Sequence, residues 1–462
     1  MHSPEVTADH VVVGSGVVAA AVALELAGRL GTVALVGDLG DRTGQASAAA
    51  GAMLGVFSEA GADEVPAERD AEVAERLAAR RRYDGWLASL HAGDRPPLRV
   101  DPGVAVIANA LGDDDRAGLA AIRAAAANAG ATAEDLDPTG MPGYRPAPEA
   151  RALDAVHLPD EGSVDTATLL EALALTLRAH AGVTVVDDRV TSLAGTTVTT
   201  RDGRRVQGAT VVLAPGAGGT LLDDPELDLP FVFAGRGVSA LVRGPVPGPA
   251  MAIRTPNRAF ACGLHLVPRR GGLTYLGATN RLSTEADLDH EPTIEEIATV
   301  LDGTSRELDR RLGRAGVLAV RVGHRPVTAD RLPLVGRTAQ EHVLVATGTY
   351  RNGILLAPHL ADLIAGEVDH PGALAAHRWR PDRPFVAPDL DALLEAGLDG
   401  LVGHLRDGDR RDELRGLLLA ALRGNVGDGQ GHRSVKAAAR LLQRAPMTEV
   451  LPLVVDLLSR PR

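Results

Sequence analysis

Two arginines in the second half of the chain could hold a carboxylate. Arg325 lies in the Val-Gly-His-Arg-Pro block of residues 322–326, and Arg351 follows a Gly-Thr-Tyr turn at the point where a helix is expected to begin. A guanidinium stays charged and its planar fork can donate two parallel hydrogen bonds to one carboxylate. The pair predicts a site for a small carboxylic acid, with Arg325 as the better candidate. The alternative for either arginine is a surface position or an ion pair with a neighbouring carboxylate.

A glycine-rich turn near the N-terminus could bind a dinucleotide. Gly14 and Gly16 follow the apolar run 11–13, and Ala19 stands where a small residue lets a helix pack closely on a strand. The first glycine allows the tight turn, the second lets the backbone approach a pyrophosphate, and the following helix supplies amide donors. Alone this motif also fits an ordinary glycine turn. The flanking strand and helix, with an acid about 20 residues on, indicate nucleotide binding.

The expected acid is displaced by one position. A second apolar strand, 33–36, ends in Gly37, where the ribose-binding carboxylate is usual, and Asp38 follows it. We therefore predict that Asp38 replaces the usual acid.

Alternating patterns along the chain predict an α/β protein of two lobes, with the nucleotide-binding lobe built from separate segments. Helices are predicted over 67–91, 113–129 and 166–180, strands within 96–108 and over 183–186 and 209–214, a hairpin of 196–199 with 204–206, and a large alternating sheet over 231–318. Four amphipathic helices are predicted between 390 and 458, as an appendage that packs on the two lobes or on a partner subunit.

Composition excludes several functional classes. With 462 residues, a net charge of −12 and no basic cluster with interleaved aromatics, the chain is not expected to bind nucleic acid. The first apolar stretch is interrupted by glycines, so no membrane span is predicted.

The single cysteine, Cys262, fits a reducing cytoplasm, and few lysines suggest a bacterial source with a GC-rich genome. The histidines are scattered without ligand spacing, so no metal site is predicted.

Four ordered blocks resemble the D-amino-acid-oxidase superfamily of FAD-dependent amine oxidases, and most of all its glycine oxidases of thiamine biosynthesis. The blocks are residues 47–54, 266–269 with 277–279, 322–326 with 332–336, and 350–358, within a similarity that covers roughly residues 9–380. The resemblance implies a Rossmann-like FAD-binding domain and an antiparallel-sheet substrate domain, followed by a C-terminal helical extension outside the resemblance. The expected boundaries are 1–92, 151–230 and 318–380 for the first domain, 93–150 and 231–317 for the second, and 381–462 for the extension.

The resemblance also implies the chemistry. A small amino acid or N-substituted glycine would transfer a hydride from Cα to flavin N5, giving an imine, and O2 would reoxidise the flavin to give H2O2. The residues expected at the reacting end are Arg325, Arg351, His265, Asn280 and Met53. Those expected to bind non-covalent FAD are Gly14, Gly16, Ala19, Asp38, Arg42, Ser47, Ala50, Gly51, Val190, Gly216, Ala217, Arg325, Arg351, Asn352, Gly353 and Ile354.

Two positions depart from the glycine-oxidase pattern. His265 replaces a tyrosine that contributes to carboxylate binding, and Asn280 replaces an apolar methionine. A histidine can change charge near neutral pH, although it can equally be a hydrogen-bonded residue of the sheet. Both changes predict a more polar pocket and favour a modified glycine as substrate. Cys262 does not match the attachment cysteine of relatives with covalent flavin, so non-covalent FAD is expected.

Other functions remain open from the sequence. The chain could be a flavin-dependent dehydrogenase or an electron-transferring subunit, with the C-terminal helices as its docking surface. It could also act on a carrier-bound or secondary-metabolite amine, or have lost its chemistry. A homo-oligomer is a further expectation.

Overall fold

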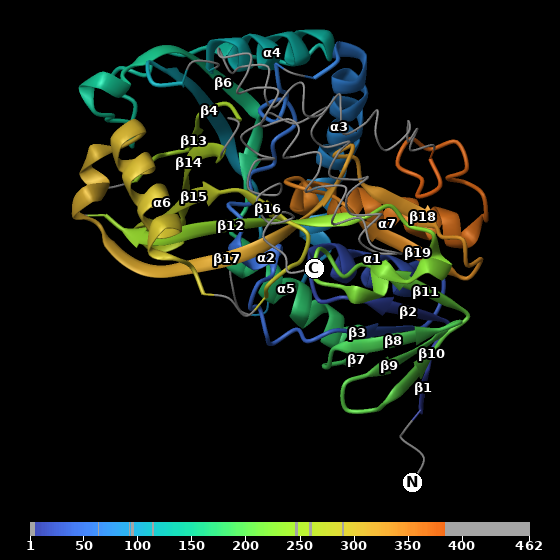
Figure 1. Ribbon diagram of the computed structural model, residues 1–462. Coiled ribbons are helices and arrows are strands. Elements are labelled where there is room, and N and C mark those ends of the chain that lie inside the picture. The colour runs from blue at the N-terminus through green and yellow to red at the C-terminus, as the bar shows by residue number, and fades with distance from the viewer. Residues whose placement is uncertain are drawn as a thin grey trace, which may run out of the picture.

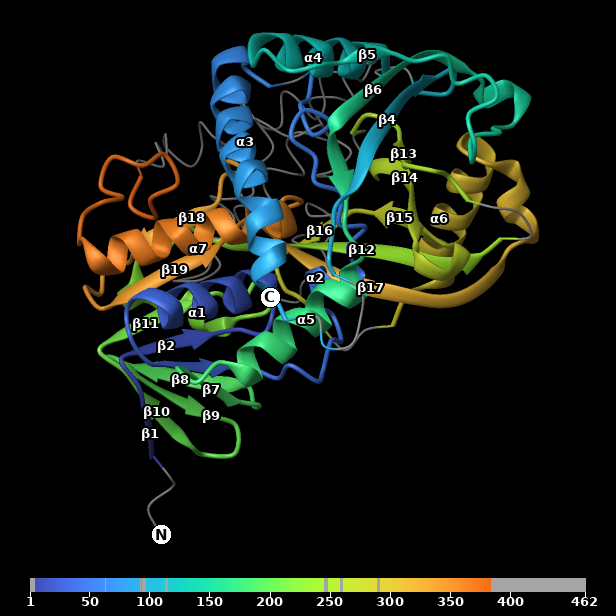
Figure 2. The ribbon, with the colours of Figure 1, turned by 180° about the vertical axis from the view of Figure 1, so that it is seen from behind.

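The structure, a computed structural model, describes residues 5–383 apart from 63, 92, 94–96, 113–114, 245–247, 258–260 and 289–290. The predicted C-terminal helices between 390 and 458 lie outside the described residues. Figure 1 shows two lobes, each built on a sheet, and the same chain crosses between them several times. The reverse view in Figure 2 shows the long helix α3 (Pro66–Ser89) running from one lobe to the other.

The first lobe is built on a mostly parallel sheet of six described strands, in the order β18-β19-β11-β2-β3-β7. All neighbours are parallel except β18 and β19. The strands are β2 (His10–Val13), β3 (Val33–Val36), β7 (Val183–Val186), β11 (Thr210–Leu213), β18 (Leu334–Arg337) and β19 (Val343–Thr347). Every residue of β2, β3 and β19 is buried. Continuous valine and leucine runs suit this sheet because both of its faces are covered.

Different elements cover the two faces of this sheet. One core joins the sheet to α1 (Val17–Arg29), α5 (Thr166–Ala179) and α7 (Gly353–Asp369). A second core joins it to a smaller sheet, which contains β1 (Glu5–Thr7), β8 (Val190–Ala194), β9 (Thr197–Thr200) and β10 (Arg205–Gln207). The predicted hairpin is confirmed, because β9 and β10 pair antiparallel about Asp202 and Gly203.

The second lobe is built on a larger sheet of nine described strands. Its strands are β4 (Asp101–Asn109), β5 (Glu134–Asp135), β6 (Ala152–Ser163), β12 (Val232–Arg243), β13 (Ala252–Arg254), β14 (Ala261–Arg269), β15 (Leu273–Thr279), β16 (Arg281–Ser283) and β17 (Gly316–Thr328). The pairs are antiparallel except for β13 with β4. Helices α4 (Asp115–Asn128) and α6 (Ile294–Glu307) pack against it, and α2 (Ala46–Ala49) lies against β17. The predicted fold class, with an α/β lobe and an antiparallel-sheet lobe, is confirmed.

One element within the predicted sheet region was missed. Residues 294–307 form α6 rather than a strand, and a capping box opens the helix: Thr293 and Glu296 each bond the other's backbone amide. Only Val300 and Thr304 of this helix are buried, but Ile294, Ile297, Val300 and Leu301 recur at helical spacing. That periodicity and the Thr-x-x-Glu spacing were the available signals.

Two strands depart from the expected domain boundaries. β6 lies within residues 151–230, which were expected in the FAD-binding domain, and β17 spans the boundary at 318, yet both belong to the large sheet. The boundaries themselves stay predictions. In the part of the chain that the structure describes, no helix is both long and apolar enough to span a bilayer.

Candidate functional site

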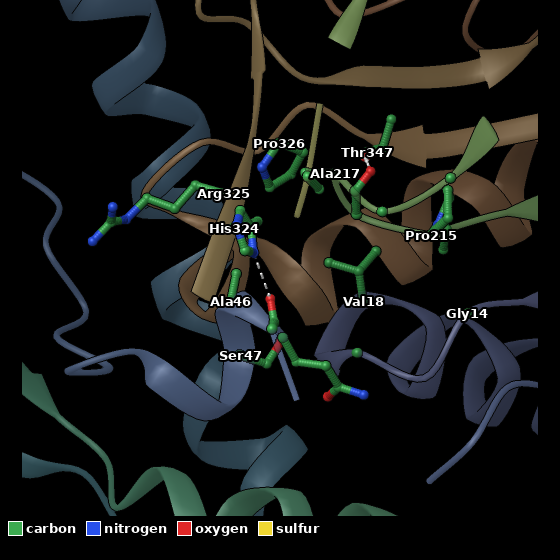
Figure 3. Close-up of a pocket in the computed structure, with 18 of the residues that line it drawn as sticks. Gly14, Val18, Ala46, Ser47, Pro215, Ala217, His324, Arg325, Pro326 and Thr347 are labelled. Carbon is green, nitrogen blue, oxygen red and sulfur yellow. Dashed lines mark hydrogen bonds between the residues drawn. The ribbon is translucent and has the colours of Figure 1, made fainter. Parts of the chain in front are cut away.

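A cleft of about 570 Å³ runs between the two lobes. Its walls come from the turn after β2, the loop before and within α2, the turn after β11, strand β17 and the start of α7. Figure 3 shows the Arg325 side chain extending from β17 away from the end of the cleft where Gly14 and Val18 lie. The cleft therefore has two distinct ends, which we call the cradle, around Gly14, and the clamp, around Arg325.

The cradle is shaped by backbone that leaves no room for side chains. Gly14 has φ +139°, and a Cβ there would collide with the carbonyl oxygen of Ala214. The same Cβ would lie 3.1 Å from that of Ala19, a fully buried residue of α1. Gly16 lines the cleft and is the N-cap of α1, with no side-chain cap. The exposed amides and positive end of the helix suit a pyrophosphate, so this surface fits a dinucleotide such as FAD.

The structure explains why the ribose acid is displaced. A Cβ on Gly37 would lie 2.5 Å from the carbonyl oxygen of Gly14, so only glycine fits at this position. Asp38 lines the cleft instead, and its Oδ1 accepts hydrogen bonds from the amides of Gly40 and Asp41, both 2.9 Å long. Those bonds hold the carboxylate in a turn, and the binding of a ribose by Asp38 stays a prediction.

Side chains of the 41–47 loop fasten it to the glycine turn. Arg42 donates from Nη1 to the Ser15 carbonyl over 3.1 Å, and burial lowers the pKa of this guanidinium, although Asp38 opposes the shift. Gln45 donates from Nε2 to Ser15 Oγ over 2.8 Å. Ser47 Oγ accepts from the Val17 amide over 3.2 Å and so satisfies one unpaired donor of α1. Gln45 lines the cleft but was not predicted, because a lone glutamine in a loop carries no motif.

Four more of the residues expected to bind FAD also line the cleft. Val190, Gly216 and Ala217 all line it, and Ala50 does so on the loop opposite. Thr347 Oγ1 donates to the Gly216 carbonyl over 3.1 Å, which fixes the turn after β11.

The two arginines line the clamp, and a network connects them. Arg325 donates from Nη1 to Asn280 Oδ1 (3.1 Å) and to the carbonyls of Thr279 (3.2 Å) and Gly235 (3.4 Å). Asn280 Nδ2 in turn donates to the Tyr350 hydroxyl over 2.8 Å. The Arg351 guanidinium lies 4.5 Å from the centre of the Tyr350 ring.

Two of the three residues expected to bind FAD at the start of α7 line the cleft. Gly353 and Ile354 line the cleft at the positive end of this helix. The Asn352 amide donates to the Thr349 carbonyl over 2.9 Å, so it closes the preceding turn instead of facing a ligand.

His265 lies in the large sheet, beside the clamp. It is 5% exposed, its Nδ1 lies 2.8 Å from the Gly263 carbonyl, and its ring stacks on Tyr275 at 5.6 Å. Burial lowers the pKa of this histidine to about 4. Of the two alternatives for His265, the burial and the contact with Gly263 favour a neutral, hydrogen-bonded histidine of the sheet.

Neither Met53 nor Gly51 lines the cleft, although both lie on the loop behind it. The Gly51 carbonyl accepts from Arg269 Nη2 over 2.7 Å, and a Cβ on Gly51 would approach His265 Nε2 to 3.0 Å. Met53 is half-buried and forms a bridge with Ser163 of β6. These residues shape the loop that lies between the cleft and strands β6 and β14 of the large sheet.

A buried charge network behind this loop was missed in the sequence. Arg254 is 1% exposed and donates from Nη1 to Glu59 over 2.5 Å, while Asn257 bonds both. Burial alone would raise the pKa of Glu59, but the charges of Arg254 and Arg351 lower it to about 2. Glu161 accepts from three successive amides, 56–58, and burial raises its pKa. The sequence holds no short motif for this network, because its members come from separate segments.

Metal binding finds no support within the described residues, which contain no group of three or more His, Cys, Asp or Glu side chains suited to an ion. The cleft is thus lined by backbone amides at one end and by guanidinium groups at the other.

Comparisons with known proteins agree with this arrangement. Residues 9–367 match a family model described as DAO, FAD dependent oxidoreductase. A glycine oxidase from Geobacillus kaustophilus is 29% identical over 375 residues, which cover 78% of this chain and 93% of the relative. The crystal structure of glycine oxidase from Geobacillus kaustophilus has a TM-score of 0.68 and 26% identity, with 82% of this chain and 99% of that one covered.

A longer relative is the bifunctional protein ThiO/ThiG from Synechocystis sp., which is 28% identical over 404 residues, or 82% of this chain and 54% of that protein. The chain therefore spans about half the length of this relative. The family model, by contrast, matches well over half of the chain, and the resemblance that the four sequence blocks indicated is confirmed. This protein belongs to the DAO family of FAD-dependent oxidoreductases.

Proposed function

We propose that the protein is an FAD-dependent oxidase of a small amino acid or an N-substituted glycine, with O2 as the electron acceptor. The observation that carries the proposal is one cleft with a dinucleotide cradle at one end and two arginines at the other. The likeness to glycine oxidases supports the same substrate class. FAD, when bound, supplies the two-electron oxidation of the substrate amine to an imine.

The residues of the chain would divide the remaining work between them. Arg325 has one edge, Nε with Nη2, that makes no hydrogen bond to a described residue, and this edge matches the two oxygens of a carboxylate. Arg351 adds a second positive charge at the clamp. The start of α7 brings Gly353 and Ile354 to the cleft. The partial positive charge at this helix N-terminus would stabilise negative charge on the flavin as the substrate is oxidised.

The geometry narrows the substrate class. Asn280 uses its amide on Arg325 and Tyr350, and His265 is neutral and bonded within the sheet, so neither adds charge to the clamp at neutral pH. Both features support a substrate with one carboxylate and a small amine, such as glycine or an N-alkyl glycine. Non-covalent FAD is part of the proposal, because the described residues that line the cleft include no cysteine.

The proposal is tested by anaerobic mixing of the purified flavoprotein with glycine, sarcosine, D- and L-alanine, D-proline and N-alkyl glycines. Rapid bleaching of the oxidised-flavin absorbance by one of these amines is the expected result. No bleaching by any of them, in protein that carries FAD, would contradict the assigned substrate class.

The acceptor needs a separate measurement. The reduced protein is mixed with air-saturated buffer and H2O2 is assayed against the flavin that is reoxidised. One H2O2 for each reoxidised flavin is expected of an oxidase. Slow reoxidation without peroxide, together with fast reoxidation by an artificial dye, would instead indicate the dehydrogenase or electron-transferring subunit. The cytoplasmic location and homo-oligomer predicted from the sequence stay predictions.

A further inference from the structure

The two arginines of the clamp are connected through Asn280 and Tyr350, two side chains outside the predicted carboxylate contact. We propose that Asn280 and Tyr350 are positioning residues that hold both guanidinium groups as one preformed unit for a single carboxylate. This inference rests on the proposed function, since it assumes that the clamp binds a carboxylate. It assigns Asn280 a role that differs from lining the pocket.

The direction of the hydrogen bonds makes Asn280 a specific connector. An arginine has donors and no acceptor, so the carboxamide oxygen must face Arg325, as it does at 3.1 Å. The amide nitrogen is then left to donate to the Tyr350 hydroxyl at 2.8 Å. Asn280 is 6% exposed, so water competes little for either bond. An apolar residue of similar size would lose both bonds at once.

The bond to Asn280 also orients the Arg325 fork. All three hydrogen bonds that Arg325 makes to described residues start from Nη1, which faces the backbone of β12 and the end of β15. With Nη1 held there, the plane of the guanidinium and the direction of its opposite edge are set. That opposite edge is the one required for a bidentate contact with a carboxylate.

Tyr350 carries the connection across to the second arginine. Its backbone has φ 47°, a left-handed conformation that is costly for a tyrosine and that persists only where surrounding contacts enforce it. One such contact is the 2.8 Å bond from its amide to the carbonyl of Pro326, the residue next to Arg325. The ring of Tyr350 then faces the Arg351 guanidinium at 4.5 Å, a cation–π distance.

The arrangement has an energetic consequence for binding. Two long, flexible side chains that converge on one ligand lose rotamer entropy when they become ordered. The Asn280–Tyr350 contacts order both arginines before a ligand arrives. Carboxylate affinity should therefore depend on two residues that need not touch the ligand.

The test uses the holoprotein and simple carboxylate probes, so it requires no turnover. Acetate and glycolate are titrated into the wild type, Asn280→Leu, Tyr350→Phe and the double variant, with Kd taken from the change in flavin absorbance. Loss of a hydrogen bond to a charged or partly charged partner should weaken binding about tenfold in Asn280→Leu. Tyr350→Phe removes one hydroxyl and keeps the ring against Arg351, so a smaller loss, about threefold, is expected.

The double variant gives the decisive comparison. If both residues act through one connection, the double variant should bind about as weakly as Asn280→Leu alone, because the contact is already lost. Losses that multiply would show independent effects and overturn the proposal, as would an unchanged Kd in Asn280→Leu. Should Asn280→Leu fail to fold, Tyr350→Phe with unchanged probe affinity would overturn it as well.

Failure of the coupling and failure of the proposed function give different results. A wild type that carries FAD but binds neither probe would remove the carboxylate clamp and both proposals with it. A wild type that binds the probes, beside an Asn280→Leu variant of equal affinity, would remove the coupling alone. FAD content is expected to stay at the wild-type value in every variant, because no changed residue belongs to the cradle, and Tm is measured to show that each variant is folded at the temperature of the titration.

Discussion

The cradle and the clamp bind charge in opposite ways, although they belong to one cleft. At the cradle the backbone supplies the binding surface, and side chains are excluded from Gly14 and Gly37 by contacts within van der Waals distance. At the clamp the long side chains of Arg325 and Arg351 supply it, and Asn280 and Tyr350 hold them in place. The cradle is centred on one strand–turn–helix unit, on which the Ala214 carbonyl closes, whereas the clamp is assembled from side chains of several distant segments. The two ends should therefore respond differently to substitution.

Replacing Arg325 should have the largest effect on the clamp without affecting the cradle. Arg325→Ala removes the fork that would hold the carboxylate and leaves the cradle intact. We expect kcat/KM for the preferred amine to fall about 10³-fold, mainly through KM, with normal FAD content. Arg325→Lys is the matched control, because it keeps the charge without the planar fork and should lose less. Unchanged kinetics in Arg325→Ala would show that the clamp does not hold the substrate.

The burial of His265 beside the clamp should make the stability of the protein depend on pH. The pKa of His265 is about 4 in the folded protein, against 6.5 as the ordinary value, so the unfolded chain binds more protons between these values. Stability should therefore fall as the pH drops from 6.5 towards 4, by up to about 3 kcal/mol from this residue. Urea unfolding of wild type and His265→Phe at several pH values measures the difference. If the free energy of unfolding changed equally with pH in the two proteins, His265 would not contribute to the pH dependence of stability.

Disturbing the cradle should affect flavin binding before it affects the substrate. Gly14→Ala places a Cβ against the Ala214 carbonyl at φ +139°. Strain of about 1–3 kcal/mol should lower Tm and reduce FAD retention, while the fraction that keeps FAD should show a normal KM. Gly366→Ala in α7 serves as the control, since no atom outside the helix backbone lies within 4 Å of its added Cβ. A raised KM with full FAD content in Gly14→Ala would contradict the separation of the two ends.

One glycine of the large sheet should behave as part of the clamp. A Cβ on Gly237 would collide with both terminal nitrogens of Arg325. Because the end of this side chain can move, Gly237→Ala should fold normally and displace the guanidinium. We expect KM to rise about tenfold, with Tm and FAD content near those of the wild type. A drop in Tm with an unchanged KM would mean that the backbone of the sheet is displaced and that the Arg325 side chain keeps its position.

The sequence supports the cradle more directly than the clamp for a physical reason. Gly14, Gly16 and Ala19 lie within six residues of one strand–turn–helix unit, so the sequence places them together. Arg325 and Arg351 were predicted as candidates through their motif context. Their connection through Asn280 and the steric role of Gly237 could not be predicted from the sequence, because these residues meet only after β12, β15 and β17 pair.

The same distinction holds for the fold. Buried strands such as β2 and β3 were predicted closely from continuous valine runs, since a parallel sheet needs no polar face. Helix α6 was missed because it lies inside a long region of alternating strands, although its own apolar residues recur at helical spacing. Glu59 and Arg254 were missed because nothing local distinguishes a buried ion pair from two surface charges.

The contact between Gly14 and Gly37 limits which amino acids can occupy these two positions in related sequences. A Cβ at position 37 would lie 2.5 Å from the Gly14 carbonyl, so the two positions form one steric constraint shared by two loops. An acidic residue at 37 would require the turn after β2 to lie farther from β3. Substitutions at 14 and 37 should therefore covary among homologues, with an acid at 37 confined to chains whose glycine turn has moved, and an acid at 38 inherited together with glycine at 37.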